Sequence, residues 1–258
     1  MAEPIKTGLA TAATFLLLLA AWTLAIDVFE LSPQILPSPA AVAEAFWYGW
    51  SGGAFVPHAI FTLQGALGGW AIGAVLGALA GAVVAESNLA RRVLYPMVIA
   101  VQSMPTVAIA PLIVVYFGVD LPSKLVTVAL LCFFPVFVNT VAGLTSADSH
   151  LLDLYRANGA SRWRTLIDVK VPSAADAVFA GAQVAIVLSF IGAVVSEFVA
   201  SRAGLGHLIK TFANDLNVAV MFAAIATLAL LGAGIGTALA RLREAVIFWK
   251  PRHGPQQR

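Results

Sequence analysis

Long apolar segments recur along the whole chain and decide what it can fold into. An α-helix needs roughly 20 mostly apolar residues to cross the hydrocarbon core of a bilayer. Of the 258 residues, 60% are hydrophobic and only 11% are charged, whereas a soluble globular protein is about a quarter charged. The sequence therefore predicts an all-α, polytopic membrane protein. The predicted spans are residues 8–28, 58–85, 93–117, 123–143, 175–199 and 218–240.

The distribution of lysine and arginine gives the orientation of these spans. If the N-terminus is cytoplasmic, twelve basic residues lie on the cytoplasmic side and only Lys124, Arg202 and Lys210 lie on the other. Cytoplasmic loops of membrane proteins are enriched in lysine and arginine, so both termini are expected in the cytoplasm. The twelve are Lys6, Arg91, Arg92, Arg156, Arg162, Arg164, Lys170, Arg241, Arg243, Lys250, Arg252 and Arg258.

The six spans are expected to form one transmembrane domain covering residues 1–258. Residues 1–57 supply the first helix and an external segment, and residues 58–248 form the core, with an inner loop at about 145–173. Lys6 precedes the first apolar run, as in a secretory signal peptide. That run is long enough to cross the bilayer, so an uncleaved helix is favoured.

Glycines in the second span recur at every fourth position. At 100° per residue they form one slowly drifting stripe along the helix. Stripes of small residues allow close contact between helices in membranes. The stripe therefore predicts that this helix is central to the bundle and tightly packed. Its members are Gly65, Gly69, Gly73, Gly77 and Gly81.

Polar residues in the third and fifth spans are candidates for a solute pathway. Pro96, Pro105 and Pro111 interrupt the third span, and an interior proline bends a helix and frees a carbonyl. Freed groups in a membrane need protein or water partners. A membrane carboxylate is a functional candidate, although Glu197 lies near the outer end, where it could instead bond the following loop. The candidates are Gln102, Ser103, Met104, Pro105, Gln183, Ser189 and Glu197.

Most kinds of catalytic site are not expected. The chain has no GxxxxGK[ST] phosphate-binding loop, so it is not expected to hydrolyse ATP itself. Its single cysteine, Cys132, rules out an intrachain disulfide and a CxxC metal site. The four histidines lack metal-ligand spacing, and the basic tail has a topological explanation without nucleic acid. We therefore expect no enzyme activity, no metal and no nucleic-acid partner.

The inner loop between the fourth and fifth spans begins with a short amphipathic helix. Leu151, Leu154 and Tyr155 stand at positions i, i+3 and i+4, which places them on one face. Asp148 or Ser149 can cap the start of this helix. An exposed apolar face on a short helix outside the membrane indicates a docking surface.

The second half of the loop predicts a turn and another helix. Gly159 suits the left-handed end of the first helix. Ser161 can cap a second helix that runs to Val171, and Pro172 is expected to mark a break before the fifth span.

The spacing of this loop resembles the EAA loop in permease subunits of bacterial binding-protein-dependent ABC importers. That motif reads E-A-A, three residues, G, nine residues, then I-x-L-P. Here Asp153 stands at the glutamate, Gly159 follows six positions later, Val169 and Val171 replace isoleucine and leucine, and Pro172 closes the motif. The departures are aspartate for glutamate and Leu-Tyr for Ala-Ala at 154–155.

Four further segments resemble one branch of that family, which includes permeases for aliphatic sulfonates, taurine, nitrate and thiamine-precursor pyrimidines. The resemblance covers about residues 36–249, and it is specific for the family and not for the substrate. The segments are LPSP at 36–39, QSMPTVAIAPLIVVYFG at 102–118, FFPVFVNTVAGL at 133–144 and AGLGHLI at 203–209.

The resemblance implies the type I importer permease fold in a bacterial inner membrane. It implies a pathway between two permease subunits, expected to be identical, with two cytoplasmic ATPase subunits that bind ATP and Mg, and a periplasmic solute-binding protein. It also implies that the inner loop docks into the ATPase. The docking residues would be Leu151, Asp153, Leu154, Tyr155, Arg156, Ala157, Asn158, Gly159, Ala160, Ser161, Arg162 and Pro172.

Two other classes of protein share the predicted spans. An ion-driven secondary transporter would need charged groups near the middle of the membrane, and these spans carry almost none. A structural membrane subunit without a transport role fits the spans but gives no account of the inner loop. Association with a separate ATPase distinguishes both from an ABC importer permease.

Overall fold

The computed structural model describes residues 2–248, and for residues 2–9 only the backbone. Within that range the regular structure is entirely helical. Lys250, Arg252, Arg258 and the side chain of Lys6, which entered the charge argument, lie outside the described residues. The elements are α1 (Ala2–Val28), α2 (Pro39–Ser51), α3 (Phe55–Glu86), α4 (Asn88–Gln102), α5 (Thr106–Phe117), α6 (Leu121–Thr145), α7 (Ser149–Ala157), α8 (Arg162–Thr165), the π-helix η1 (Leu166–Lys170), α9 (Val171–Ala200), α10 (Leu205–Asn214) and α11 (Val218–Val246).

Helices α3, α6 and α9 form the centre of the bundle. The five glycines of the α3 stripe are all buried, and they lie against α6. A Cβ atom added at Gly73 would lie 2.4 Å from the Ala129 carbonyl oxygen, and one added at Gly77 would lie 2.5 Å from that of Phe133. The absence of side chains on this face of α3 therefore sets how closely the two backbones approach.

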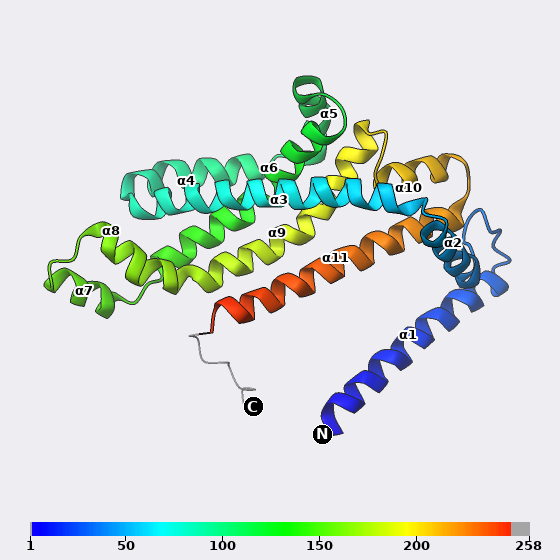
Figure 1. Ribbon diagram of the computed structural model, residues 1–258, viewed down its shortest axis with the longest axis horizontal. Helices are drawn as coiled ribbons and strands as arrows, with labels where there is room; N and C mark the ends of the chain where they lie inside the picture. Colours follow the sequence, from blue (N-terminus) through cyan, green and yellow to red (C-terminus); the bar gives the residue numbers. More distant parts are fainter. Residues whose placement is uncertain (1, 249–258) are drawn as a thin grey trace.

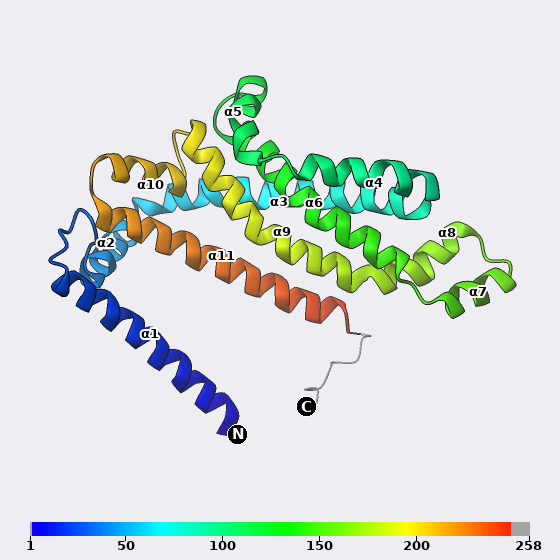
Figure 2. The ribbon, with the colours of Figure 1, turned by 180° about the vertical axis from the view of Figure 1, so that it is seen from behind.

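Helix α1 stands apart from the rest of the bundle and meets it near α2 (Figures 1 and 2). Phe15, Leu16 and Leu17 on α1 are all more than 60% exposed. Near its end, Trp22 contacts Phe222 of α11, with ring centroids 5.7 Å apart. The first span is thus a peripheral helix whose apolar surface faces outward, as a helix in contact with lipid would.

The predicted third span is not one helix. Helix α4 ends at Gln102, α5 begins at Thr106, and the two meet at 93°. Pro105 occupies the N-cap of α5, where its missing amide hydrogen costs no helical hydrogen bond, whereas a proline inside a helix removes one. Pro96 and Pro111 lie inside α4 and α5 without ending them. Among the described residues, five helices are long and apolar enough to cross a membrane, or six if the bent pair counts as one span.

Different short helices lie at the two ends of the bundle (Figure 1). Helices α7 and α8 lie at one end, beside the turn between α3 and α4, and we refer to it as the α7 end. Helices α2 and α10 lie at the opposite end, which we refer to as the α10 end.

Candidate coupling loop, pathway residues and buried ion pair

Helix α7 forms where the amphipathic pattern predicts it. Asp148 caps the helix, since its side chain accepts a hydrogen bond of 2.8 Å from the backbone N–H of His150. Leu151 and Leu154 are 44% and 55% exposed, and no residue of α7 is buried. The chain therefore leaves two leucines of a short helix open at the α7 end. Beside them, Arg156 and Asp153 form an exposed ion pair of 2.9 Å.

The turn after α7 depends on Gly159. Its φ angle is +70°, a left-handed conformation that glycine adopts with little cost. The backbone N–H of Ala160 donates to the Tyr155 carbonyl at 3.0 Å, which is the outer bond of a Schellman motif. Ser161 then caps α8, because its Oγ accepts from the N–H of Arg164 at 3.2 Å. The segment from α7 to η1, which we refer to as the coupling loop, is thus a helix, a glycine turn and a second helix.

The predicted break at Pro172 is wrong. Helix α8, η1 and α9 run on as one continuous helical segment of 39 residues, Arg162–Ala200. Proline removes one donor from the helical ladder. Here the ladder changes register just before it, since the N–H of Val171 donates to the Leu166 carbonyl across a π-turn. Pro172 then lies in the first turn of α9, a position that proline tolerates.

Four of the pathway candidates gather at one place. Gln102, Ser103, Met104 and Pro105 occupy the corner between α4 and α5, and all four are exposed. The Ser103 hydroxyl donates back to the Ile99 carbonyl at 3.2 Å. On α9, Gln183 is half-buried, so it also remains a candidate.

The structure does not support the other two pathway candidates, Ser189 and Glu197. Ser189 is 0% exposed and its hydroxyl donates to the Ile186 carbonyl at 2.7 Å. Glu197 is 1% exposed, and both of its carboxylate oxygens accept hydrogen bonds inside the protein. A side chain without exposed surface cannot touch a passing solute in this conformation. Both contribute to packing inside the bundle.

Glu197 is the centre of a buried polar cluster that joins four helices. Lys124 of α6 forms an ion pair with it at 2.7 Å, and both side chains are 0% exposed. Thr62 of α3 donates to the same oxygen at 2.8 Å, and the backbone N–H of Gly206 in α10 donates to the other oxygen at 2.6 Å. Thr62 in turn accepts from the N–H of Leu205 at 2.8 Å. The carboxylate thereby holds the start of α10 against the bundle.

The Lys124 ammonium also has partners on the side that faces away from Glu197. Its ammonium donates to the Phe61 carbonyl at 3.2 Å and lies 3.6 Å above the Phe61 ring. Three glycines make room for the cluster, because a Cβ added at Gly65, Gly204 or Gly206 would lie less than 3.0 Å from Lys124 or Glu197. These glycines are needed for the buried pair to fit.

The charge pattern counted Lys124 as one of three basic residues on the outer side, and the structure adds that its side chain is buried and paired there instead of facing solvent. Lys124 and Thr62 were not recognised as partners of Glu197, although the alternative of a structural bond from Glu197 to the following loop is confirmed by the Gly206 contact. The available signal was one cation and one carboxylate near the same end of two apolar spans. A charge in such a place requires a partner.

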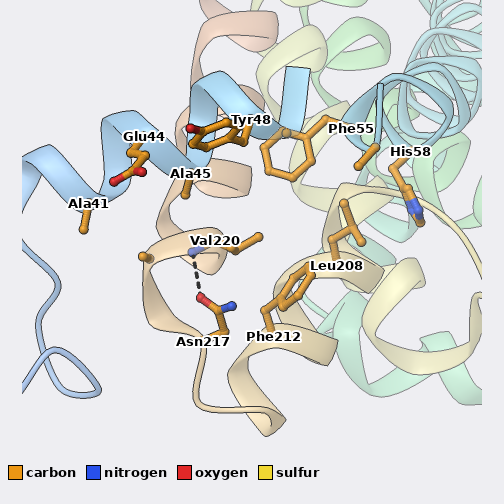
Figure 3. Close-up of a pocket in the computed structure, with 13 residues that line it drawn as sticks. Ala41, Glu44, Ala45, Tyr48, Phe55, His58, Leu208, Phe212, Asn217 and Val220 are labelled. Carbon is orange, nitrogen blue, oxygen red and sulfur yellow. Dashed lines mark hydrogen bonds between the residues drawn. The ribbon is translucent and has the colours of Figure 1, made fainter. Parts of the chain in front are cut away.

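A cavity of about 540 Å³ opens at the α10 end between α2, α3, α10 and α11. Figure 3 shows Glu44 and Tyr48 on one side of it and Leu208 and Phe212 on the other. Its polar lining is partly used within the fold, since the His58 ring accepts from the N–H of Gly204 at 3.0 Å. The cavity marks where the predicted external segment rests on the core.

Residues 73–247 match the family described as "Binding-protein-dependent transport system inner membrane component". This chain belongs to that family. The match covers the α3–α6 contact, the glycine-turn loop and α9 to α11, which are the parts of the bundle described above. The chain is accordingly a multi-pass component of an inner membrane.

Curated relatives extend the likeness over nearly the whole chain. The riboflavin transport system permease protein RibX of Chloroflexus aurantiacus is 36% identical over 92% of this chain and 88% of its own length. The putative aliphatic sulfonates transport permease protein SsuC of Escherichia coli is 31% identical over 98% of this chain and 97% of its own. The formylaminopyrimidine transport permease protein ThiX of Halalkalibacterium halodurans is 30% identical over 92% and 94%.

The fold has a solved counterpart in the inward-facing methionine ABC transporter MetNI, with a TM-score of 0.59 at 19% sequence identity, covering 81% of this chain and 98% of the other. The present chain is therefore the permease subunit of an ABC importer for a small solute. The resemblance of its inner loop had predicted this function. The classes of ion-driven transporter and structural subunit are thereby set aside.

Proposed function

We propose that the chain acts as a homodimer that forms the translocation pathway, with two ATPase subunits docked on its α7 end. The observation that carries this proposal is the loop of helix, glycine turn and helix, which leaves Leu151 and Leu154 open to a partner. An exposed apolar pair beside the ion pair of Asp153 and Arg156 suits a groove on another protein. The ATPase subunits supply the ATP and Mg sites.

The proposed coupling runs through the continuous segment Arg162–Ala200. Its first residues follow the glycine turn, and its far part carries Glu197, which holds α10. At 1.5 Å per residue, 39 residues span roughly 58 Å. When ATP closes the ATPase pair, movement of the docked loop is thus carried to the α10 end by one helix. The π-turn at η1 lies between the docking site and the span, and π-turns inside helices occur frequently at functional sites.

The orientation of the permease follows from its basic residues. Arg91, Arg156, Arg162 and Lys170 lie around the α7 end, and their excess supports a cytoplasmic position for it. Because α1 ends near α2 at the other end, the N-terminus is also cytoplasmic in this arrangement. A periplasmic binding protein would deliver solute at the α10 end.

The corner between α4 and α5 is the proposed contribution of each subunit to the pathway. Gln102 and Ser103 offer polar groups there. Toward the other end of α5, Val115 and Tyr116 are 78% and 76% exposed, which leaves an apolar surface for a second copy of the chain.

The proposed solute is a small organic molecule of the kinds named for the relatives, such as a sulfonate or a vitamin or its precursor. Among the described residues, the cation inside a span at the α10 end, Lys124, is buried and paired. Its ammonium group is therefore not available to bind an anionic solute. This supports selection of the solute by the binding protein.

The test exchanges Gly159 for valine and for asparagine in the permease–ATPase complex, reconstituted with its binding protein. No atom lies within 4 Å of a Cβ at this position, so the substitutions probe the backbone conformation and not a clash. A side chain held at positive φ costs on the order of 1–3 kcal/mol, and asparagine tolerates this region better than a β-branched residue.

We expect Gly159→Val to lose solute-stimulated ATP hydrolysis and uptake, and Gly159→Asn to retain most of both. Solute uptake and phosphate release are measured in the same proteoliposomes. Stimulated hydrolysis at the wild-type level in Gly159→Val would contradict the assigned role of the loop. A purified permease that never associates with an ATPase would contradict the proposed function as a whole.

A further inference from the structure

A polar cleft of about 460 Å³ lies at the α7 end, on the inner side of the coupling loop. It is enclosed by the end of α3, the start of α4, the end of α6 and the segment from α7 to η1. One water occupies about 30 Å³ in the liquid, so the cleft has room for a hydrated polyatomic ion. The exposed leucines of α7, by contrast, do not line it.

The cleft has an excess of positive charge. Its basic lining residues are Arg91, Arg156, Arg162 and Lys170, and its one acidic lining residue is Glu86, which pairs with Lys170 at 2.6 Å. Arg156 pairs with Asp153 outside the cleft. When both partners, Glu86 and Asp153, are counted against these four cations, the described residues leave a net charge of +2 at the cleft.

Two of these arginines have no carboxylate partner among residues 10–248, the part of the chain whose side chains the structure describes. Arg91 donates only to the neutral side-chain oxygen of Asn88, at 3.1 Å, and Arg162 makes no ion pair with a described residue. They come from opposite walls, Arg91 from α4 and Arg162 from the loop. Guanidinium groups match the geometry of phosphate oxygens and bind them by paired hydrogen bonds.

The position of the cleft also suits a phosphate group. Helix α3 ends at Glu86 and α4 begins at Asn88, so the cleft lies at the end of α3 and the start of the bent pair of α4 and α5, both of which are apolar enough to cross a membrane, where lipid headgroups are expected. The first turn of α4 lines it, and the start of a helix favours an anion. Basic pockets between transmembrane helices at this level bind anionic headgroups.

We propose that this cleft binds an anionic phosphate group, from a phospholipid headgroup or from free phosphate, between Arg91 and the arginines of the coupling loop. A bound phosphate would link the coupling loop to the turn between α3 and α4. Binding is tested on the full-length permease alone, so the result does not depend on the proposed function.

The probes are dioctanoyl-phosphatidylglycerol, dioctanoylglycerol, which lacks the phosphate, and inorganic phosphate. Each is titrated into detergent-solubilised permease, and binding is followed by native mass spectrometry and by the melting temperature. Arg91→Gln removes a cleft cation. Arg92→Gln is the matched control, because Arg92 is the neighbouring exposed arginine and does not line the cleft.

We expect phosphatidylglycerol to bind and dioctanoylglycerol not to bind. Arg91→Gln should weaken binding about tenfold, as the loss of one charge-assisted hydrogen bond would, while Arg91→Lys keeps much of it and Arg92→Gln matches the wild type. If inorganic phosphate alone binds with the same dependence on Arg91, it is the source of the group.

Equal losses in Arg91→Gln and Arg92→Gln would overturn the proposal, because they indicate general attraction to a basic surface. Equal binding of the two dioctanoyl probes would overturn it as well. If Arg91→Gln weakens ATPase association and leaves phosphatidylglycerol binding unchanged, the cleft receives an acidic side chain of the partner and the proposal fails.

Discussion

Removing either partner of the Lys124–Glu197 pair should destabilise the permease strongly, whereas neutralising both should restore most of the loss. The variants are Lys124→Met, Glu197→Gln and the two combined. Lys124→Met leaves a buried carboxylate with only the donors from Thr62 and Gly206. Glu197→Gln leaves a buried ammonium with the Phe61 carbonyl and ring. The combined variant has no buried charge and keeps an amide oxygen for one of the two donors, Thr62 or Gly206.

The magnitude follows from complete burial, since both side chains are 0% exposed. Breaking a buried ion pair by removing one partner costs about 3–5 kcal/mol, because the remaining charge is uncompensated, whereas replacing both can be close to neutral. For a chain of this size 1 kcal/mol corresponds to roughly 2–4 °C in melting temperature. Each single variant should therefore melt on the order of 6–20 °C lower.

The assay is the melting temperature of the purified permease in detergent, followed by the loss of the monodisperse peak in size-exclusion chromatography. Arg202→Gln is the control, because Arg202 lies 3.9 Å from Asp120 at the same end and is 84% exposed. An exposed pair contributes about 0–1 kcal/mol, so this variant should melt near the wild type. If the combined variant loses as much as the two single losses added together, the two charges are not coupled, and the reasoning is refuted.

Two further predictions concern the core and the docking surface. Gly77→Ala places a Cβ 2.5 Å from the Phe133 carbonyl oxygen and should cost about 1–3 kcal/mol through overpacking, seen as a lower melting temperature. Gly234→Ala, where no atom lies within 4 Å, should be neutral or stabilising, and equal effects of the two would contradict the close contact of α3 and α6. Leu154→Ala should weaken association with the ATPase about tenfold or more, as the loss of a buried leucine would. Leu89→Ala is the control, because Leu89 is 73% exposed and lies on α4, outside the coupling loop. Affinity for the ATPase is measured on a surface that carries the immobilised permease. A comparable loss of affinity in Leu89→Ala would argue against α7 as the docking helix.

Local signals in the sequence predicted local structure well. Asp148 and Ser161 cap helices α7 and α8 as expected, because a cap needs only a side chain two or three residues from its donor. Gly159 takes the left-handed turn for an equally local reason. The apolar spans were predicted because length and hydropathy alone decide what can cross a bilayer.

Where the prediction depended on neighbours in space, it was incomplete or wrong. Pro105 and Pro172 are both prolines in or beside long helices, yet one lies at a 93° corner and the other in the first turn of a continuing helix. The difference is a π-turn before Pro172 and an unwound corner before Pro105. Proline fixes only its own φ angle and its missing donor, so the bend depends on the surrounding packing.

The sequence by itself determined the helical class, the spans and the glycine-turn loop that identified the family. Only the tertiary structure decided that Lys124, Glu197 and Thr62 share one buried cluster. In the sequence, Lys124 lies 73 positions and Thr62 lies 135 positions before Glu197. Hydropathy records how apolar a segment is, whereas a buried ion pair depends on which helices meet and where glycines leave room. Glu197 also holds α10, through the backbone N–H of Gly206, at the far end of the helix that begins at the coupling loop.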